Sequence, residues 1–414
     1  MKIILAAGII VVPLLYSRGL DVFNLPKEIA FRAEAILLLA AAVFWATARR
    51  RAENLRALQP AAILVAIILA WTAITTLTST NRALSADTLI TVVAAAVIFM
   101  ATILAAQTTS IVAVDLVMIG ACANSIMVIL QELKIWTPFV HEAEATTQYK
   151  SVGLLGNTNF VGSYLAGPAL AAIVLAVVAS GKRRWVYAAV AALVGTGLVL
   201  SETRTALVAV VVALAVFALR SRRGALVALA AAVIVAALML SPRTDLGAHM
   251  RELTDAVSKR DYETLFSERL LPALAAVDMI RDHPLTGVGP GCFRFNFMRY
   301  RLRVGEHYPA AWTRGYPGYW STVHNDHLEV AAETGLPGYA LFLIAIFMGV
   351  RMSGAPRPPG GLEWAFARAM RWPLAALILL LCLAQFPLEL AAPRLALLTL
   401  GALCAGWSGG AVAD

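Results

Sequence analysis

The residues best suited to chemistry lie in one short stretch, STVHNDHLEVAAETGLPG at 321–338. It carries His324 and His327 among carboxylates, directly ahead of the apolar run 336–350. A neutral imidazole has an ordinary pKa of about 6.5, so it can take a proton from a hydroxyl group near neutral pH. His324 is therefore our candidate general base; the alternative is that it only caps the helix that follows. Because one turn of helix has 3.6 residues, His327 shares a face with His324 and either orients it or is a solvated bystander.

Four arginines are candidates for binding an anionic group. Arg204 lies in SETRTA between two apolar runs, Arg82 in STNRAL after an earlier run, and Arg281 and Arg294 in the longest polar segment. A guanidinium offers a planar fork of donors that stays charged, which suits phosphate oxygens. We rank Arg204 first, then Arg281, then Arg82. The alternatives are that Arg204 only extends its charged end to water between two helices, and that the loop arginines are solvated.

The sequence offers little for a metal or a cofactor. The four cysteines, Cys122, Cys292, Cys382 and Cys404, lie far apart, which indicates neither a disulfide framework nor a zinc site. The GVGPG segment at 287–291 lacks the spacing of a dinucleotide-binding fingerprint and predicts a tight loop. No Asp-x-Asp pair occurs on the side that we expect to be external. We therefore expect no cofactor and a metal-independent reaction in which arginines supply the positive charge.

Composition indicates the scaffold that must position these residues. The chain has 414 residues, of which 60% are hydrophobic and only 14% are charged. These values exclude an ordinary soluble domain and predict an all-α polytopic membrane protein. The net charge of +9 would suggest a nucleic-acid partner in a soluble protein, but in a membrane protein basic residues first report topology. We expect membrane lipids as neighbours and no nucleic acid.

About twelve apolar segments are long enough to be transmembrane helices. The expected spans are roughly 3–16, 29–48, 61–79, 88–106, 111–130, 159–180, 185–201, 205–219, 224–241, 327–350, 372–387 and 391–407. The first is read as a retained span rather than a signal peptide, because no cleavage site of the A-x-A kind follows it.

Basic residues orient these spans. Clusters such as Arg49 to Arg51 and Lys182 to Arg184 follow even-numbered spans, and cytoplasmic loops are enriched in Lys and Arg. Both termini are therefore expected in the cytoplasm. The expected domains are 1–241 with the first spans, 242–323 as one large external loop with amphipathic helices, and 324–414 with the last spans. Within the loop, the apolar spacing of 267–281 predicts a helix that could lie along the membrane surface.

The motif around His324 resembles a known family signature. His324 and Asn325 are followed by nine residues and then by Gly335 and Gly338, with two residues between the glycines. This pattern is similar to the His-Asn-x9-Gly-x-x-Gly signature of the O-antigen ligase superfamily, which also includes O-antigen polymerases and protein O-oligosaccharyltransferases. The arginine of SETRTA and the HPLTGVGPGCF segment are similar to family features as well.

The resemblance implies a GT-C-like fold and a lipid-linked substrate. It implies about twelve spans in the bacterial inner membrane, cytoplasmic termini, and a periplasmic active site near the loop between spans nine and ten. The implied activity is inverting transfer of a polysaccharide from undecaprenyl pyrophosphate to the lipid A core oligosaccharide in lipopolysaccharide biosynthesis. His324 would be the base, and Arg204, Arg281 in preference to Arg294, and Arg82 would bind pyrophosphate.

Two kinds of alternative stay open from the sequence. Within the superfamily, the acceptor could be a protein Ser or Thr, or another lipid-linked glycan. In a different class, the protein would be a transporter of lipid-linked glycans, although such proteins tend to show internal repeats and polar breaks in mid-membrane.

Overall fold

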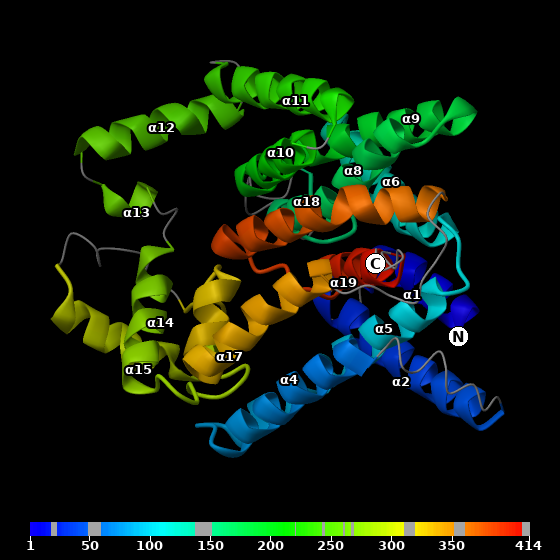
Figure 1. The fold of residues 1–414 in the computed structure, drawn as a ribbon. Helices are drawn as coiled ribbons and strands as arrows, with labels where there is room; N and C mark the ends of the chain where they lie inside the picture. The colour runs from blue at the N-terminus through cyan, green and yellow to red at the C-terminus, as the bar shows by residue number, and fades with distance from the viewer. Residues whose placement is uncertain are drawn as a thin grey trace.

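The computed structural model describes residues 1–17, 23–48, 59–136, 151–219, 221–241, 245–259, 261–265, 269–309, 319–351 and 361–407, and every regular element in these ranges is a helix (Figure 1). The helices of the first half are α1 (Lys2–Leu14), α2 (Asn24–Ala48), α4 (Gln59–Leu77), α5 (Arg82–Ala106), α6 (Val112–Glu132), α8 (Thr158–Val178) and α9 (Gly181–Leu200). Those of the second half are α10 (Arg204–Ala218), α11 (Arg222–Leu240), α12 (Asp245–Lys259), α13 (Tyr262–Leu265), α14 (Leu270–Asp282), α15 (Phe293–His307), α17 (Asp326–Arg351), α18 (Leu362–Ala384) and α19 (Ala391–Trp407).

The chain is a multi-pass membrane protein, as its composition predicts. Eight helices of the described part, α4, α5, α6, α8, α9, α11, α17 and α18, are long and apolar enough to cross a membrane. Three shorter apolar helices, α1, α10 and α19, accompany them. With the 25-residue α2, these helices coincide with the spans expected from the sequence, while a total of twelve crossings stays a prediction.

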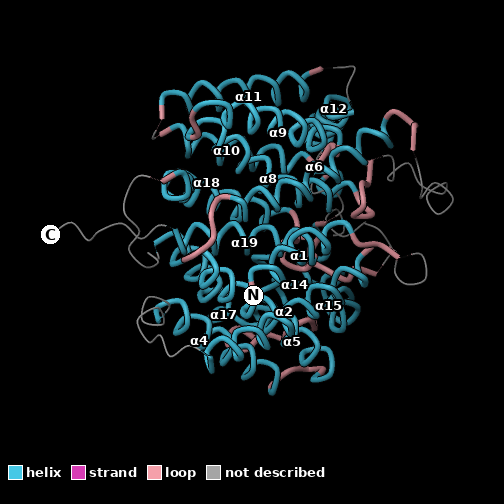
Figure 2. The backbone as a smooth tube through the Cα atoms, turned by 90° about the vertical axis from the view of Figure 1, so that its right-hand side faces the viewer, coloured by secondary structure: helices cyan, strands magenta, loops and turns pink. Residues whose placement is uncertain are grey.

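Helix α8 lies at the centre of the bundle. It packs against α6, α9, α10, α18 and α19, and most of its residues are buried, small ones such as Gly162, Ala166 and Gly167 among them. Small side chains let neighbouring helices approach closely, which is the usual basis of packing between membrane helices. Helices α11 and α4 lie at opposite edges of the bundle, as both views show (Figures 1 and 2).

Large apolar side chains on the outer helices are exposed. Ile3 is 85% exposed, Leu240 79% and Phe44 75%. A soluble protein rarely leaves so much apolar surface in water, whereas such side chains are at ease against lipid tails. The outer surface of the bundle therefore fits a bilayer environment.

Helices α12 to α15 gather at one end of the molecule, on the left of Figure 1. Helix α14 packs between α15 and α17, and its residues Leu271, Ala275 and Met279 are buried with Phe293 and Phe297 of α15. The helix predicted at 267–281 is present as α14, and its placement along the membrane surface stays a prediction. The apolar face of α14 has the spacing of a surface helix, but other parts of the protein cover it.

Candidate functional site

His324 lies just before α17 and not within it. Its backbone has a φ of 59°, a left-handed conformation that residues other than glycine seldom adopt. The cap of the helix is its neighbour Asn325, whose Oδ1 accepts a hydrogen bond of 3.0 Å from the backbone N–H of Leu328. The capping role is thus filled by Asn325, which leaves the His324 imidazole available for another purpose.

His327 does not share a helical face with His324, contrary to expectation. Because α17 begins at Asp326, only His327 is part of the helix. Its Nε2 lies 2.9 Å from the backbone oxygen of Leu379, and its Nδ1 lies 3.3 Å from the hydroxyl of Tyr339. His327 therefore links α17 to α18 and does not orient His324.

The His324 ring is enclosed by aromatic side chains. It meets Phe386 edge to face, with ring centroids 4.5 Å apart, and Trp320 in the same way at 5.1 Å. Its Nδ1 is buried and has no hydrogen-bond partner among the described residues. Burial, and then the positive charge of Arg269, lower the pKa of His324 to about 3. The imidazole is therefore neutral at physiological pH, the state in which it can accept a proton.

Arg269 is the functional candidate that sequence reasoning missed. Its Nη1 donates a hydrogen bond of 2.6 Å to the backbone oxygen of Ala384, next to the loop that carries Phe386. Burial, and then the positive charge of Arg204, lower the pKa of Arg269, while Arg269 itself acts on His324. The charge of Arg269 thus acts on the imidazole of His324, and the charge of Arg204 acts on Arg269.

A signal for Arg269 was present in the sequence. The residue is the N-cap of α14, where the helix dipole disfavours a cation. An arginine in that place is unfavourable for the helix, so another interaction must favour it. The apolar spacing of 267–281 predicts a helix but not its first residue, so the sequence alone did not show that Arg269 is the N-cap.

Arg204 is held in place by the turn that precedes it. It is the first residue of α10, and the hydroxyl of Thr203 before it donates to the backbone oxygen of Thr158 at 2.8 Å. The turn lies tightly against α8, because a Cβ on Gly162 would come within 2.3 Å of the Thr203 side chain. The buried Thr203 therefore fixes the backbone from which the partly buried Arg204 side chain extends.

The other predicted arginines are exposed, and only Arg294 among them lines the cavity of His324. Arg281 is 65% exposed on its side chain and pairs with Asp278 at 3.2 Å, and it also donates to the hydroxyl of Tyr308. Arg82 is exposed at the start of α5. Arg294 is exposed as well but lines the same cavity as His324. The structure therefore places Arg269, and not Arg281, beside the histidine.

His324 opens onto a cavity of about 380 Å³. Acidic side chains contribute much of its wall: Glu329 and Glu333 from α17, and Glu389 from the loop between α18 and α19. Asn157 and Asn159, at the start of α8, complete the polar lining. Such a wall offers many hydrogen-bond acceptors to hydroxyl groups.

The two glycines of the signature, Gly335 and Gly338, allow neighbouring segments to pack closely against α17. Gly335 has a φ of 72°, and a Cβ there would lie 2.1 Å from the backbone oxygen of Leu285. A Cβ on Gly338 would come within 2.9 Å of the Trp71 indole nitrogen. The two glycines thus allow the 284–291 loop and α4 to approach α17, and they support the site without touching His324.

Glu333 fastens the same loop to α17. Its two carboxylate oxygens accept hydrogen bonds from the backbone N–H groups of Gly291, at 2.7 Å, and Phe293, at 2.8 Å. The backbone N–H of Val288 donates to the Ala332 oxygen at 2.9 Å. The loop is therefore a structural element, as its glycines predict, and it closes one side of the cavity.

The described residues contain no group of three or more His, Cys, Asp or Glu side chains arranged to hold a metal ion. The site offers a neutral imidazole on a polar cavity, with the guanidinium of Arg269 in electrostatic range of it and that of Arg204 in range of Arg269. Such an arrangement can accept a proton at one point and stabilise an anion at another.

Comparison with known proteins agrees with the motif. Residues 189–343 match the model of a family described as O-antigen ligase. The matched segment includes Arg204, Arg269 and His324. No curated protein is similar enough to the chain to count as a match. The family match over residues 189–343 and the histidine signature together support a relationship to the O-antigen ligase superfamily.

Proposed function

We propose that the protein is an O-antigen ligase, an inverting and metal-independent glycosyltransferase of the bacterial inner membrane. It transfers a polysaccharide from undecaprenyl pyrophosphate to the lipid A core oligosaccharide. Its termini lie in the cytoplasm and its site faces the periplasm, in agreement with the basic clusters that follow even-numbered spans. The observation that carries the proposal is a buried, neutral His324 on a polar cavity, with Arg269 close enough to lower its pKa and Arg204 close enough to act on Arg269.

The residues divide the reaction between them. His324 takes the proton from the acceptor hydroxyl, whose oxygen attacks the anomeric carbon of the first sugar of the donor. The bond from that carbon to undecaprenyl pyrophosphate breaks on the opposite face, so the anomeric configuration inverts. Arg204 and Arg269 stabilise the negative charge of the departing pyrophosphate. In this proposal Arg269 takes the role that the sequence suggested for Arg281.

The low pKa of His324 fits a base that is activated by the donor. In the empty site, burial and the charge of Arg269 both disfavour a proton on the imidazole. A pyrophosphate bound to Arg269 offsets that positive charge, so it raises the basicity of His324. The histidine then gains its proton affinity when the donor is in place.

The alternatives concern the acceptor and the class of protein. A protein O-oligosaccharyltransferase or an O-antigen polymerase would use the same residues with another acceptor. A transporter of lipid-linked glycans would move the donor without making a new bond.

One reconstituted assay separates these possibilities. Purified protein in liposomes receives undecaprenyl-pyrophosphate-linked glycan with three competing acceptors: lipid A core, a Ser-rich protein and a second lipid-linked glycan. The ligase proposal expects product on lipid A core. Product on either of the other acceptors reassigns the protein within the superfamily, and glycan movement without any covalent product overturns the enzyme proposal.

A further inference from the structure

Helix α15 has two apolar faces, and the described part of the chain covers only one of them. Phe293 and Phe297 on the inner face are buried and pack with residues of α14. Phe295, Met298 and Leu302 on the outer face are 55%, 47% and 72% exposed. A helix that is apolar on more than one side normally has protein or lipid against each of those sides. The outer face of α15 therefore requires a partner.

The three exposed side chains form one continuous apolar stripe. Phe295, Met298 and Leu302, which we call the α15 stripe, occupy positions i, i+3 and i+7, so they lie on the same side of the helix. Successive residues are separated by about 100° around the helix axis, which places Arg299 on one border of the stripe and Arg301 on the other. The whole of α15 contains four arginines and one glutamate. The stripe thus combines an apolar centre with positively charged borders.

The start of α15 lies at the level where two membrane helices end. The amide nitrogen of Asn296 donates to the hydroxyl of Thr80 at 2.8 Å, and the Cys292 sulfur donates to the backbone oxygen of Asn81 at 3.4 Å. Thr80 and Asn81 belong to the turn between α4 and α5, which are both long and apolar enough to cross a membrane. A turn between two such helices lies at a surface of the bilayer. Helix α15 therefore begins at that surface, beside α14 and the end of α17 (Figure 1).

The composition of α15 suits the plane of the membrane surface. With 15 residues and four arginines, it is not a candidate membrane span. A helix with an apolar stripe between basic residues typically lies in the surface, with the stripe at the boundary of the acyl chains and the basic side chains among the head groups. An arginine binds phosphate oxygens with its planar fork of donors, and positive charge near a bilayer attracts anionic lipids. These properties favour anionic phospholipids as the partner of the outer face.

We propose that the α15 stripe lies in the bilayer surface on the side of His324 and binds anionic phospholipids. The three apolar side chains contact the upper part of the acyl chains, and the arginines at the borders bind the phosphate groups. This adds a lipid-binding surface outside the candidate site, and it does not depend on glycosyl transfer.

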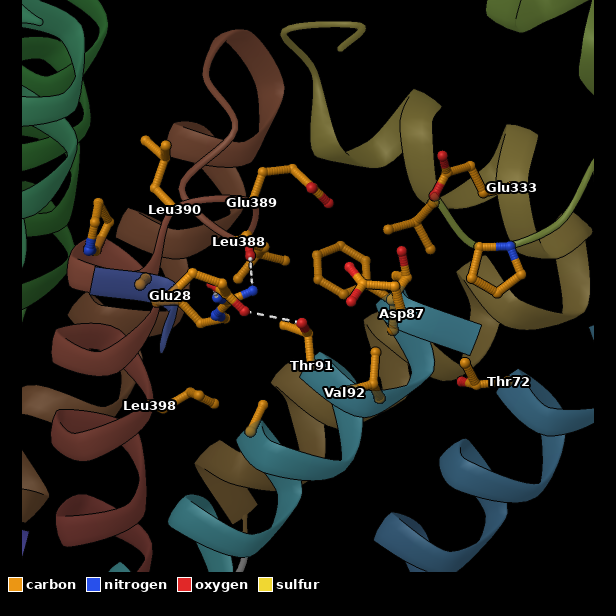
Figure 3. Close-up of a pocket in the computed structure, with 18 of the residues that line it drawn as sticks. Glu28, Thr72, Asp87, Thr91, Val92, Glu333, Leu388, Glu389, Leu390 and Leu398 are labelled. Atoms are coloured by element: carbon orange, nitrogen blue, oxygen red, sulfur yellow. Dashed lines mark hydrogen bonds and ion pairs between the residues drawn. The ribbon is translucent and has the colours of Figure 1, made fainter. Parts of the chain in front are cut away.

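The same helix contributes a residue to the cavities of the bundle. Arg294, in the first turn of α15, lines the cavity of His324 and also a second cavity of about 560 Å³ between α2, α4, α5, α17 and α19 (Figure 3). The wall of the second cavity contains two ion pairs between distant helices, Arg32 with Asp87 and Arg394 with Glu28.

The first turn of α15 is also bonded to α17. The backbone N–H of Phe293 donates to Glu333 at 2.8 Å, and Glu333 is among the labelled residues of the second cavity in Figure 3. A displacement of α15 would therefore move Arg294 relative to both cavities. Lipids that hold the α15 stripe at the bilayer surface thus also help to hold Arg294 in place.

Two exposed positions on neighbouring helices provide a matched test. Met298→Cys places a bimane label on the stripe, and Leu302→Cys provides a second label there. Arg281→Cys is the control outside the stripe, because the Arg281 side chain on α14 is 65% exposed. The four native cysteines are buried or half-buried, and the chain without an added cysteine measures their background labelling.

The measurement is quenching of the label in nanodiscs that contain phosphatidylcholine and phosphatidylglycerol. In parallel samples, one or the other lipid carries a nitroxide on its acyl chain near the head group. A helix in the membrane surface enters the head-group boundary by about 5–10 Å, so nitroxide lipids should quench the label at 298 or 302 at least about threefold more than the label at 281.

The charge of the lipid tests the role of the arginines. At equal mole fraction, phosphatidylglycerol should quench the label at 298 more strongly than phosphatidylcholine. Arg299→Gln should lower this preference by about fivefold, since it removes one basic residue from the bilayer surface. Arg281→Gln removes the same charge from α14 and should leave the preference unchanged.

The possible outcomes are distinct. Equal quenching at 298 and 281 overturns the inference, and so does an absence of quenching at both 298 and 302, which would leave the stripe in water or against another protein. Equal quenching by the two lipids at 298 overturns the assignment to anionic phospholipids. Because the nanodiscs contain no glycan substrate, none of these results depends on the proposed function, which the transfer assay tests separately.

Discussion

The ring of Phe386 meets the imidazole of His324 edge to face, with centroids 4.5 Å apart and planes at 87°. Phe386 in turn packs against Phe160 of α8 at 5.6 Å. The histidine is thereby connected to the central helix of the bundle, α8, although its own backbone lies in a loop. This contact orients the imidazole without a hydrogen bond, and it removes the ring from water, which is the main cause of its low pKa.

Replacement of His324 should remove transfer without unfolding the protein. General-base catalysis is typically worth about 100- to 10,000-fold in rate, so His324→Ala should lower kcat by a factor in that range. His327→Ala is the matched control, because His327 bonds to the Leu379 oxygen and to Tyr339 and not to the cavity. Its kcat should stay within about threefold of wild type. A loss of only twofold in His324→Ala would count against a catalytic role.

The arginines can be tested by changing their shape while keeping their charge. Lysine cannot reproduce the planar fork of donors that binds phosphate at two points. Arg269→Lys and Arg204→Lys should therefore lower kcat/KM for the donor by about tenfold or more. Arg281→Lys should have little effect, because Arg281 is exposed and its partners are Asp278 and Tyr308. The reverse ranking, with Arg281 sensitive and Arg269 tolerant, would restore the sequence-based choice of the loop arginine.

The activity of the protein should not show the decrease near pH 6.5 that protonation of an ordinary catalytic histidine causes. An ordinary imidazole is half protonated near pH 6.5, whereas the pKa of His324 is lowered to about 3. The pH dependence of kcat/KM reports groups of the free enzyme, in which His324 should stay neutral between pH 7.5 and about 5. Protonation of His324 should therefore cause no decrease in kcat/KM over this range. A loss of kcat/KM with a midpoint between pH 6 and 7 in the wild type would show that the ring is hydrated rather than buried.

The lowered pKa of His324 also makes the free energy of unfolding depend on pH. The unfolded chain binds a proton at His324 below about pH 6.5, but the folded protein does not until about pH 3. The contribution of His324 to the free energy of unfolding is therefore complete above about pH 6.5, and it decreases as the pH falls from about 6.5 to about 3. His324→Gln, which cannot titrate, should melt with a weaker dependence on pH between 6.5 and 4 than wild type.

The sequence predicted the scaffold well, because the length and hydropathy of membrane helices are local properties. It also marked His324 and Arg204 as candidate site residues through residue type and motif. It did not predict the positions of side chains that depend on packing between distant segments. Arg269 became a candidate only through its electrostatic effect on His324 and that of Arg204 on it, and the sequence did not show that α15 and α17 pack against α14.

The cavities were beyond sequence reasoning for a similar reason. Arg32 is separated by 55 residues from its partner Asp87, and Arg394 by 366 residues from Glu28. Ion pairs between such distant positions depend on how α2, α5 and α19 pack. The roles of Gly335 and Gly338 likewise became clear only when the 284–291 loop and Trp71 were found against them.

The glycines of the 287–291 loop allow a final prediction about how the site is supported. Gly287 has a φ of 65°, and a Cβ there would lie 2.3 Å from the backbone carbon of Glu333. Gly287→Ala should therefore strain the backbone and push the loop away from α17, at a cost of about 2 kcal/mol or more in the free energy of unfolding.

Gly305→Ala is the matched control, since Gly305 lies within α15 and has nothing within 4 Å of the added carbon. Alanine favours a helix over glycine by about 0.5–1 kcal/mol, so this variant should melt at the same or a higher temperature than wild type. Thermal melting of both variants in detergent, followed by circular dichroism, checks the contrast. Equal melting temperatures would mean that the loop is not packed against Glu333 in the membrane protein.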